Sequence, residues 1–302
     1  MNINRRNFVK SALIGTTAMA ATASPLVLLE REPAKEDKKA LKLSFQDGIA
    51  PGRSLAEKFD FMEEYGIEGF EPRGTGLVDC LGEYQQLLRG RNIRISAVCS
   101  GIKGFIMNED AVVRDQYKSL IKDIIAVAGE LGSVGVIIVP VCNGQKSDDI
   151  HRSGIRNFLI EQMTELAEYA EKHNTTVIIE PLNRKEASCF LKVADVKGIC
   201  KAVNRKGLRC MGDFWHMTRE EASDMDAFIS GGEYLNHVHI ASRETRCIPG
   251  TDGGIDNYID GFRGLKRISY KGYVSFECGI RGDRAILIPA SINLLREQWR
   301  SC

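Results

Sequence analysis

Short runs of apolar residues alternate with longer stretches of helical periodicity from residue 41 to residue 302. In the longer stretches, apolar side chains recur every three or four positions, as they do along one face of an α-helix. Several of the short runs are almost entirely apolar, which is typical of parallel strands that are buried on both faces. The expected strands are residues 41–45, 67–71, 93–99, 134–140, 176–180, 208–213, 235–240 and 273–277.

An expected helix follows each expected strand, so the pattern divides into eight strand–helix units without a remainder. The first helix shows clear end signals, because Ser54 and Glu57 form a capping box and Gly66 is a typical C-terminal stop. Strict alternation over this length favours a closed (β/α)₈ TIM barrel, an α/β fold, as a single domain spanning residues 41–302. The alternative is an open doubly wound sheet. It is disfavoured because no glycine-rich phosphate loop follows the first strand.

The first residues resemble an export signal rather than part of the barrel. Arg5 and Arg6 form a twin-arginine pair, the weakly apolar run 12–21 follows, and small residues then offer cleavage sites. We therefore expect a twin-arginine signal in residues 1–23, a linker in residues 24–40, and export to the periplasm. The alternative is a frayed N-terminal helix. The apolar run is too short to span a membrane.

Composition narrows the range of partners. The chain is 43% hydrophobic, as a globular domain requires, and its formal net charge is only +1. It contains no basic block, so we expect no nucleic-acid partner. Nine cysteines occur without a C-x-x-C pair, and several lie in the apolar runs, so we expect few or no disulfides. A small-molecule carbohydrate is the expected partner, and a homo-oligomer is left open.

Four residues with side chains that commonly bind metals follow or end successive strands in the second half of the chain. They are Glu180, Asp213, His239 and Glu277. The carboxyl ends of barrel strands meet at one face, where barrel enzymes carry their active sites. Three carboxylates and one imidazole that converge there suit a single divalent metal ion with mostly oxygen ligands.

Each carboxylate also has a simpler structural explanation. Glu180 is expected to be buried and must be paired or bound to a metal, so a salt bridge to Arg184 or Lys185 is the alternative. Asp213 precedes a predicted helical turn and could be its N-cap. Glu277 lies within the last strand region, where a helix cap does not account for it.

Two histidines lie two residues apart on one strand, so their side chains face the same way. We assign the outer one, His239, as the metal ligand and expect His237 to be a packed, hydrogen-bonded histidine of the barrel interior. His216 and Arg246 fall on loops that should cover the site, where they could bind substrate oxygens. Glu186 could bind a substrate hydroxyl. The alternative for these three is an exposed surface position.

The combined motifs resemble the xylose-isomerase-like barrels, and within them the ketose 3-epimerases and hydroxypyruvate-isomerase-like proteins. The motifs are Glu180-Pro181-Leu182-Asn183-Arg184-x-Glu186, Asp213-x-x-His216, His237-x-His239 followed by Arg246-x-x-Pro249-Gly250, and Phe276-Glu277. The similarity covers about residues 41–298 and is strongest from residue 176 onward.

This resemblance implies one divalent ion, usually manganese, cobalt or magnesium, with zinc left open. The ligands are the residues that match Glu180, Asp213, His239 and Glu277. The glutamates matching Glu180 and Glu277 also form the paired acid–base groups on opposite faces of the substrate. The same resemblance implies that His216 and Arg246 hold substrate oxygens and that Glu186 contacts the sugar.

Elementary chemistry agrees with that role. A hydrogen next to a carbonyl is too weakly acidic for a free carboxylate, and a metal stabilises the enediolate that forms when the proton leaves. We therefore expect a metal-dependent isomerase or epimerase that acts on a sugar or keto-sugar.

Three other functions stay open at this point. One is a metal-dependent lyase or hydrolase on 3-keto-glycosides, and another is a non-catalytic sugar-binding barrel. An endonuclease of the related barrel class is disfavoured, because such enzymes use many histidines and this chain has five.

Overall fold

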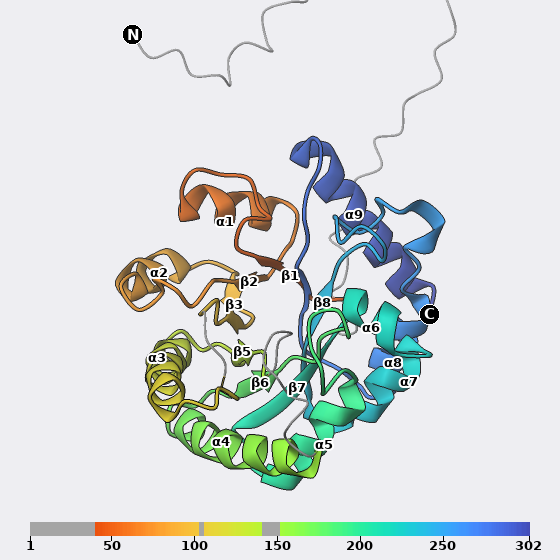
Figure 1. Ribbon diagram of the computed structural model, residues 1–302. Coiled ribbons are helices and arrows are strands. Elements are labelled where there is room, and N and C mark those ends of the chain that lie inside the picture. Colours follow the sequence, from red (N-terminus) through yellow and green to blue (C-terminus); the bar gives the residue numbers. More distant parts are fainter. Residues whose placement is uncertain (1–39, 103–105, 141–151) are drawn as a thin grey trace, which may run out of the picture. The chain divides into compact units, whose positions relative to one another are not determined.

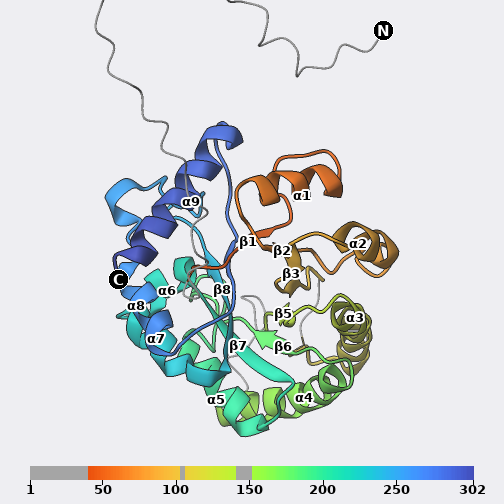
Figure 2. The same ribbon diagram turned by 180° about the vertical axis from the view of Figure 1, so that it is seen from behind.

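The computed structural model describes residues 40–102, 106–140 and 152–302. The predicted export signal and the predicted linker up to residue 39 lie outside the described residues, as does Cys142. The described residues form a parallel barrel surrounded by helices, as Figures 1 and 2 show from opposite sides. The predicted TIM barrel is therefore confirmed, and the open doubly wound sheet is wrong.

Every pair of neighbouring strands in the barrel is parallel. The strands are β1 (Leu43–Gln46), β2 (Gly69–Glu71), β3 (Arg94–Ile95), β4 (Val98–Cys99), β5 (Val136–Ile138), β6 (Val177–Ile179), β7 (Leu208–Asp213), β8 (Leu235–Ile240) and β9 (Val274–Phe276). Their order in the sheet is β3-β2-β1-β9-β8-β7-β6-β5-β4.

The third predicted strand, residues 93–99, is divided into β3 and β4. Its first half pairs with β2 and its second half pairs with β5. Between them, the amide of Ser96 donates to the carbonyl of Phe70, and the amide of Val98 donates to the carbonyl of Gly135. One interrupted strand thus closes the barrel, and the nine short strands correspond to the eight predicted ones.

The helices follow the strands in the predicted alternation. They are α1 (Leu55–Glu64), α2 (Leu81–Leu88), α3 (Ala111–Glu130), α4 (Arg152–Lys172), α5 (Val193–Val203), α6 (Phe214–Glu220), α7 (Asp224–Gly231), α8 (Ile259–Arg267) and α9 (Arg284–Arg300). The single helix expected after the sixth strand is instead two helices, α6 and α7. Each begins at its own cap, Asp213 for α6 and Ser223 for α7.

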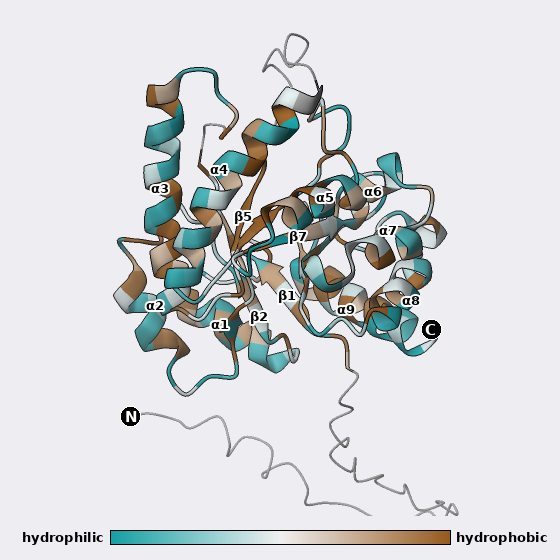
Figure 3. Cartoon of the chain, turned by 90° about the horizontal axis from the view of Figure 1, so that it is seen from below, coloured by the Kyte–Doolittle hydropathy of each residue, from teal (hydrophilic) through white to brown (hydrophobic). Residues whose placement is uncertain are grey.

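Half of the capping box predicted for α1 is present. The Ser54 hydroxyl caps the helix by accepting from the amide of Glu57, but the Glu57 carboxylate accepts from the amide of Arg53, one residue before the cap. Gly66 follows the helix with φ +64°, a left-handed conformation that glycine adopts without strain. Phe59 and Met62 bury the apolar face of α1. Figure 3 shows the same division on α3 and α4, where hydrophilic and hydrophobic residues alternate around each helix.

One half of the barrel interior is apolar. Ala97, Ile137, Ile178 and Met211 form a small buried cluster that is separate from the larger core between strands and helices. These residues come from neighbouring strands and point inward, while the residues beside them point outward into the helix layer. This alternation is the one expected for strands with two buried faces.

The other half of the interior is polar. The hydroxyls of Ser44 and Ser96 lie 2.6 Å apart, and the Ser275 hydroxyl donates to that of Ser44 at 3.3 Å. Side chains two residues apart on a strand face the same side. Gln46 and Glu277 therefore lie one layer above this serine cluster, at the carboxyl end of the barrel.

A register shift aligns two of the predicted ligands. The pairing of β7 with β8 shifts between Cys210 and Met211, which leaves Asn236 as an extra residue on β8. Beyond this bulge, Asp213 pairs directly with His239. Bulges commonly redirect side chains next to functional sites, and this one brings both residues to the same level of the barrel.

Helix α3 packs so closely against the chain after α4 that its last turn requires glycine. A Cβ on Gly129 would overlap the backbone carbonyl oxygen of His173, whereas a Cβ on Gly198 in α5 would meet no atom of the described residues within 4 Å. We expect Gly129→Ala to destabilise the fold by about 1–3 kcal/mol through overpacking. The matched Gly198→Ala should stabilise it by about 0.5–1 kcal/mol, since alanine is the better helix former. Urea denaturation checks both, and equal effects would contradict this packing.

Two further observations concern the described residues as a whole. The eight cysteines among the described residues are all free thiols. None of the helices in the described ranges is long and apolar enough to cross a membrane.

Candidate metal centre and active site

The structure brings the four predicted ligands together at the carboxyl end of the barrel. Glu180 directly follows β6, Asp213 ends β7, His239 lies near the end of β8, and Glu277 directly follows β9. One ligand atom from each side chain lies within 4.8 Å of the others. His239 Nδ1 is 3.5 Å from Glu180 Oε1 and 3.3 Å from Glu277 Oε2. Parallel strands that end at one edge produce this convergence.

The simpler explanation of Asp213 covers only half of its role. Arg184, one of the two alternative partners of Glu180, forms a salt bridge with Glu220 at 2.9 Å. Asp213 Oδ1 does cap α6, accepting from the amide of Trp215 at 2.8 Å. Its other oxygen, Oδ2, faces the cluster. The cap therefore fixes the orientation of the carboxylate and leaves Oδ2 for a ligand.

Three buried polar atoms of the cluster form no hydrogen bond within the described part of the chain. They are Glu180 Oε1, Asp213 Oδ2 and His239 Nδ1. A buried polar atom without a partner costs about 1–3 kcal/mol. A divalent cation among these atoms would satisfy all three and offset the charge of the carboxylates, so the residues fit the predicted ion. Three oxygen donors and one imidazole suit manganese, cobalt or magnesium.

Crowding of the carboxylates is also evident in their pKa values. Burial and then repulsion by Glu277 raise the pKa of Asp213 to about 6. Burial raises the pKa of Glu180, and repulsion by Glu277 raises it further, whereas the hydrogen bond from His239 opposes this increase. Burial would raise the pKa of Glu277 too, but His239 and Arg246 outweigh it and lower this pKa to about 2. A centre that holds several acids this close favours a cation.

His216 points a hydrogen-bond donor at the cluster. Its Nδ1 accepts from the backbone amide of Asn183 at 3.1 Å, so the neutral ring carries its proton on Nε2. Nε2 lies 3.5 Å from Asp213 Oδ2 and is buried. Burial also lowers the pKa of His216, which favours the neutral ring. His216 is therefore a fixed neutral donor, and the alternative of a surface histidine is wrong.

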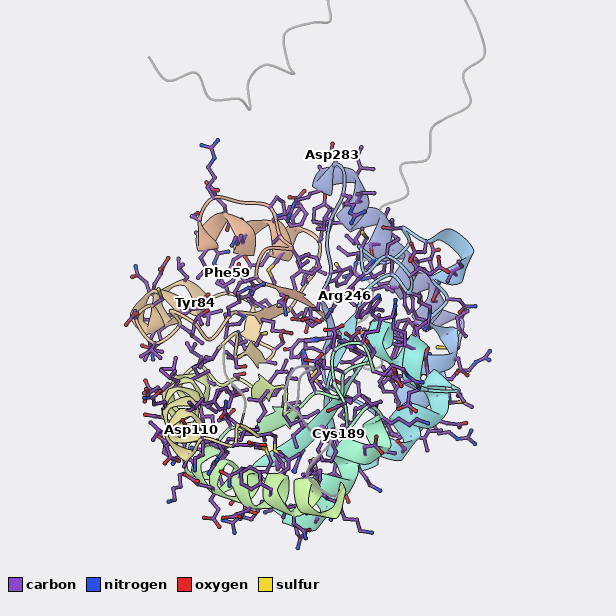
Figure 4. All side chains as sticks on the ribbon, viewed as in Figure 1. Phe59, Tyr84, Asp110, Cys189, Arg246 and Asp283 are labelled. Carbon is purple, nitrogen blue, oxygen red and sulfur yellow. The ribbon has the colours of Figure 1, made fainter. Side chains whose placement is uncertain are left out.

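Arg246 and Glu186 also lie at this site. Arg246 Nη2 donates to Glu277 Oε2 at 2.7 Å, and Nη1 is 3.9 Å from Glu186 Oε1. Figure 4 shows Arg246 toward the middle of the ring of helices, whereas Asp110 and Asp283 lie at its edge. Burial would lower the pKa of Arg246, but the negative charges of Glu277, Asp213 and Glu180 raise it above its usual value. This guanidinium therefore stays charged. The structure thus brings together every residue that the sequence predicted for the site.

Two further residues of the site were missed by the sequence analysis. Trp215 lies against the Arg246 guanidinium, 4.4 Å from its central carbon to the ring centre. Glu71, at the end of β2, is fully buried and hydrogen-bonded to both barrel histidines. Glu71 shows the same signal as the predicted ligands, an acid at the end of an apolar strand. Its partners, however, are 166 and 168 residues away in the sequence.

The fold and this constellation agree with a known family. The family model of the xylose isomerase-like TIM barrels matches residues 59–298. The chain belongs to this family. The match includes all four cluster residues and the three residues beside them, so the predicted resemblance is confirmed.

Several proteins similar to this chain are sugar epimerases. The 3-dehydro-D-guloside 4-epimerase of Escherichia coli (strain K12) is 27% identical over 253 residues, which cover 80% of this chain and 94% of the relative. The D-psicose 3-epimerase of Agrobacterium fabrum (strain C58) is 26% identical over 174 residues, covering 57% of this chain and 59% of that enzyme.

Solved structures give the same picture. The apo crystal structure of 3-keto-D-glucoside 4-epimerase from E. coli aligns with a TM-score of 0.76 and 27% identity, over 87% of this chain and 100% of that one. A D-allulose 3-epimerase from Methylomonas sp. aligns with a TM-score of 0.72 over 86% of this chain and 97% of that one. At 19% identity, the second similarity shows the fold alone.

Proposed function

We propose that this chain epimerises a keto-sugar, with a 3-keto-glycoside as its substrate class, by moving a proton on the carbon next to the carbonyl. The observation that carries this proposal is the cluster of Glu180, Asp213, His239 and Glu277, buried at the mouth of a barrel of this family. The predicted class, a metal-dependent sugar isomerase or epimerase, agrees with the activities of the relatives and with the candidate metal site.

The four cluster residues would hold the ion through three carboxylates and His239 Nδ1. We propose manganese, cobalt or magnesium, because these ions accept oxygen-rich ligand sets. When bound, such an ion supplies Lewis-acid polarisation of the carbonyl next to the labile hydrogen.

Glu180 and Glu277 are the two groups placed to move the proton. Both follow strands directly, so their backbones are held by the barrel, and His239 lies between them, 3.5 Å from one and 3.3 Å from the other. One carboxylate takes the proton from the carbon next to the carbonyl, and the other returns a proton to the opposite face. Return to the opposite face inverts the carbon, which is epimerisation.

Three side chains around the cluster would orient the sugar. His216 Nε2–H and the Arg246 guanidinium are donors for substrate oxygens, and the Glu186 carboxylate is an acceptor for a hydroxyl. Asn183 supports two of them, since its amide group donates to Glu186 at 2.9 Å and its backbone donates to His216. Held donors and acceptors of this kind place the reacting carbon between the two glutamates.

The role of Arg246 can be tested against a matched arginine. We expect Arg246→Met to lower kcat/KM about 10- to 100-fold, as the loss of a hydrogen bond from a charged donor does. Arg219 also lies over the Trp215 ring, at 3.9 Å, but its guanidinium donates to the carbonyls of Trp215 and Arg243. Arg219→Met should therefore have a clearly smaller effect. Steady-state kinetics on both variants test this role. Equal losses of kcat/KM would contradict substrate binding by Arg246.

The substrate class is supported by two matches in which this chain covers nearly the full length of the matched protein, 3-dehydro-D-guloside 4-epimerase and the crystal structure of 3-keto-D-glucoside 4-epimerase. Both names place epimerisation at carbon 4 of a sugar with a keto group at carbon 3. Carbon 4 is adjacent to that carbonyl, so its hydrogen is the type of proton that this constellation can move. The ketose 3-epimerases act on a carbon beside a keto group as well, which makes free ketoses the natural comparison substrates.

Product analysis tests the proposal. The manganese-loaded protein is incubated with a methyl 3-keto-glucoside and with fructose, and the products are resolved by NMR. We expect the 4-epimer of the keto-glycoside as the main product. Release of the aglycone would instead support the lyase alternative, because proton loss next to the carbonyl would then expel a neighbouring substituent. Binding of both sugars without any new product would support a sugar-binding barrel.

We also propose that the protein is exported through its twin-arginine segment, on the basis of the order of Arg5, Arg6, the apolar run and the small residues after it. Fractionation of a Gram-negative host tests this. The wild-type protein should reach the periplasm, and an Arg5→Lys, Arg6→Lys double variant should remain in the cytoplasm. Equal distribution of the two proteins would contradict export by this route.

A further inference from the structure

Glu71 is a fully buried carboxylate that receives hydrogen bonds from three side chains. His237 Nε2 lies 2.8 Å from Oε2, and His239 Nε2 lies 3.1 Å from both carboxylate oxygens. Gln46 Nε2 donates to Oε1 at 3.1 Å. Neither Glu71 nor Gln46 is needed for proton transfer or substrate binding as described above. Such a concentration of donors on one buried acid calls for a separate explanation.

A second metal ion is one explanation, because Glu71, His237 and His239 could hold one among themselves. The chemistry of His239 argues against it. A neutral imidazole has one ring nitrogen with a free lone pair and one that carries hydrogen. His239 can therefore bind a metal on one side only. Its Nδ1 faces the carboxylate cluster, while Nε2 faces Glu71 and no other carboxylate of the described residues, so Nε2 is the nitrogen that carries the hydrogen.

We infer that Glu71 is a positioning residue, which accepts the Nε2–H of His239 and thereby presents the Nδ1 lone pair of that ring to the metal centre. A carboxylate behind a metal-binding histidine sets the ring orientation and raises its basicity as a ligand. This inference rests on the proposed metal site. It assigns a role to a residue on β2, on the far side of the barrel interior from β6 and β7.

The same network reaches a second ligand through Gln46. Gln46 Nε2 lies 3.1 Å from Glu71 Oε1 and 3.4 Å from Glu277 Oε1. Gln46 and Glu71 are also paired neighbours on β1 and β2. The amide thus links the carboxylate behind His239 to one of the proposed acid–base glutamates.

Glu71→Gln tests the inference with little change in shape. A glutamine has a single acceptor oxygen, and its NH₂ group would face the donors of His237, His239 and Gln46. We expect Mn²⁺ affinity, measured by EPR of the free ion, to fall about 10- to 100-fold, as it does when such supporting carboxylates are lost. Glu220→Gln is the matched control. Glu220 is also a buried glutamate with a salt bridge but lies outside the cluster, so its variant should bind Mn²⁺ as the wild type does.

His237→Gln separates the carboxylate from general packing. This variant keeps an N–H donor for Glu71 and leaves Glu71 and His239 in place, so its Mn²⁺ affinity should stay close to that of the wild type. If it loses as much affinity as Glu71→Gln, the barrel interior rather than the carboxylate is responsible, and the inference is wrong. Wild-type affinity in folded Glu71→Gln would overturn it as well.

A measurement on the wild type covers the case in which Glu71→Gln does not fold. Protein with ¹⁵N-labelled histidine is loaded with Zn²⁺ as a diamagnetic probe, and its ring nitrogens are assigned by NMR. We expect His239 to carry hydrogen on Nε2 and to bind metal through Nδ1, and the reverse arrangement would overturn the inference. If the wild type binds neither Mn²⁺ nor Zn²⁺, the proposed function itself fails, which is a different outcome.

Discussion

Glu180→Gln and Glu277→Gln should each lower the rate of proton transfer next to the carbonyl about 10²- to 10⁴-fold, the usual contribution of a positioned acid or base. Glutamine keeps the length and an oxygen ligand but cannot accept or donate a proton at neutral pH. Both residues lie at strand ends and contact His239 through side chains only. We therefore expect folded proteins whose loss is mainly in kcat.

The two variants should share one informative property. If one glutamate removes the proton from a given epimer and the other returns it, each variant loses turnover in both directions, since either direction needs both groups. Glu186→Gln is a suitable comparison, because Glu186 lies beside the cluster without belonging to it. It should change KM more than kcat. Full activity in either Glu180→Gln or Glu277→Gln would contradict the paired acid–base role.

Removal of the divalent ion should abolish turnover and lower the melting temperature. Three buried atoms without a partner among the described residues, together with the mutually repelling carboxylates, indicate that a cation would stabilise the site. A ligand at a free concentration of 100 times its Kd stabilises the folded state by about 2.7 kcal/mol. For a domain of this size, we expect chelation to lower Tm by roughly 5–10 °C.

Adding a divalent ion back to the chelated protein distinguishes loss of the ion from a general effect of the chelator. Mn²⁺, Co²⁺ or Mg²⁺ should restore both Tm and turnover, and Ca²⁺ should restore turnover less well, because it prefers more ligands at longer distances. Asp213→Asn provides a protein-based control that should weaken the response to added ion. An unchanged Tm on chelation, together with full activity, would mean that the cluster does not hold a metal.

The strand-end pattern was sufficient to predict most of the site. Glu180, Asp213, His239 and Glu277 each end or follow an apolar run, and the barrel fold makes such ends converge. The distinction between the two histidines also followed from the sequence. Alternation along β8 placed both on the inner face, and His237 is hydrogen-bonded to Glu71 as a packed interior residue.

What the sequence left out depends on contacts between distant segments. Glu71 ends its strand as the predicted ligands do, but its position relative to them is visible only once β2 lies across the barrel from β8. Trp215 could not be placed at the guanidinium of Arg246, because Arg246 lies on a loop with φ +53°, a conformation that no periodicity predicts. The division of the third strand and the bulge at Asn236 arise from barrel closure and local register, which propensity does not encode.

Deuterium incorporation from D₂O is the most direct test of the central claim, that two glutamates at a metal-holding cluster move a proton next to a carbonyl. The Mn²⁺-loaded protein, its chelated form, Glu180→Gln and Glu277→Gln are compared with a methyl 3-keto-glucoside, and the proton signal beside the carbonyl is followed. We expect loss of that signal with the loaded wild type, no loss with the chelated protein, and little loss with the glutamine variant that lacks the glutamate removing the proton from this epimer. Equal loss with the chelated protein, or with both glutamine variants, would contradict the claim.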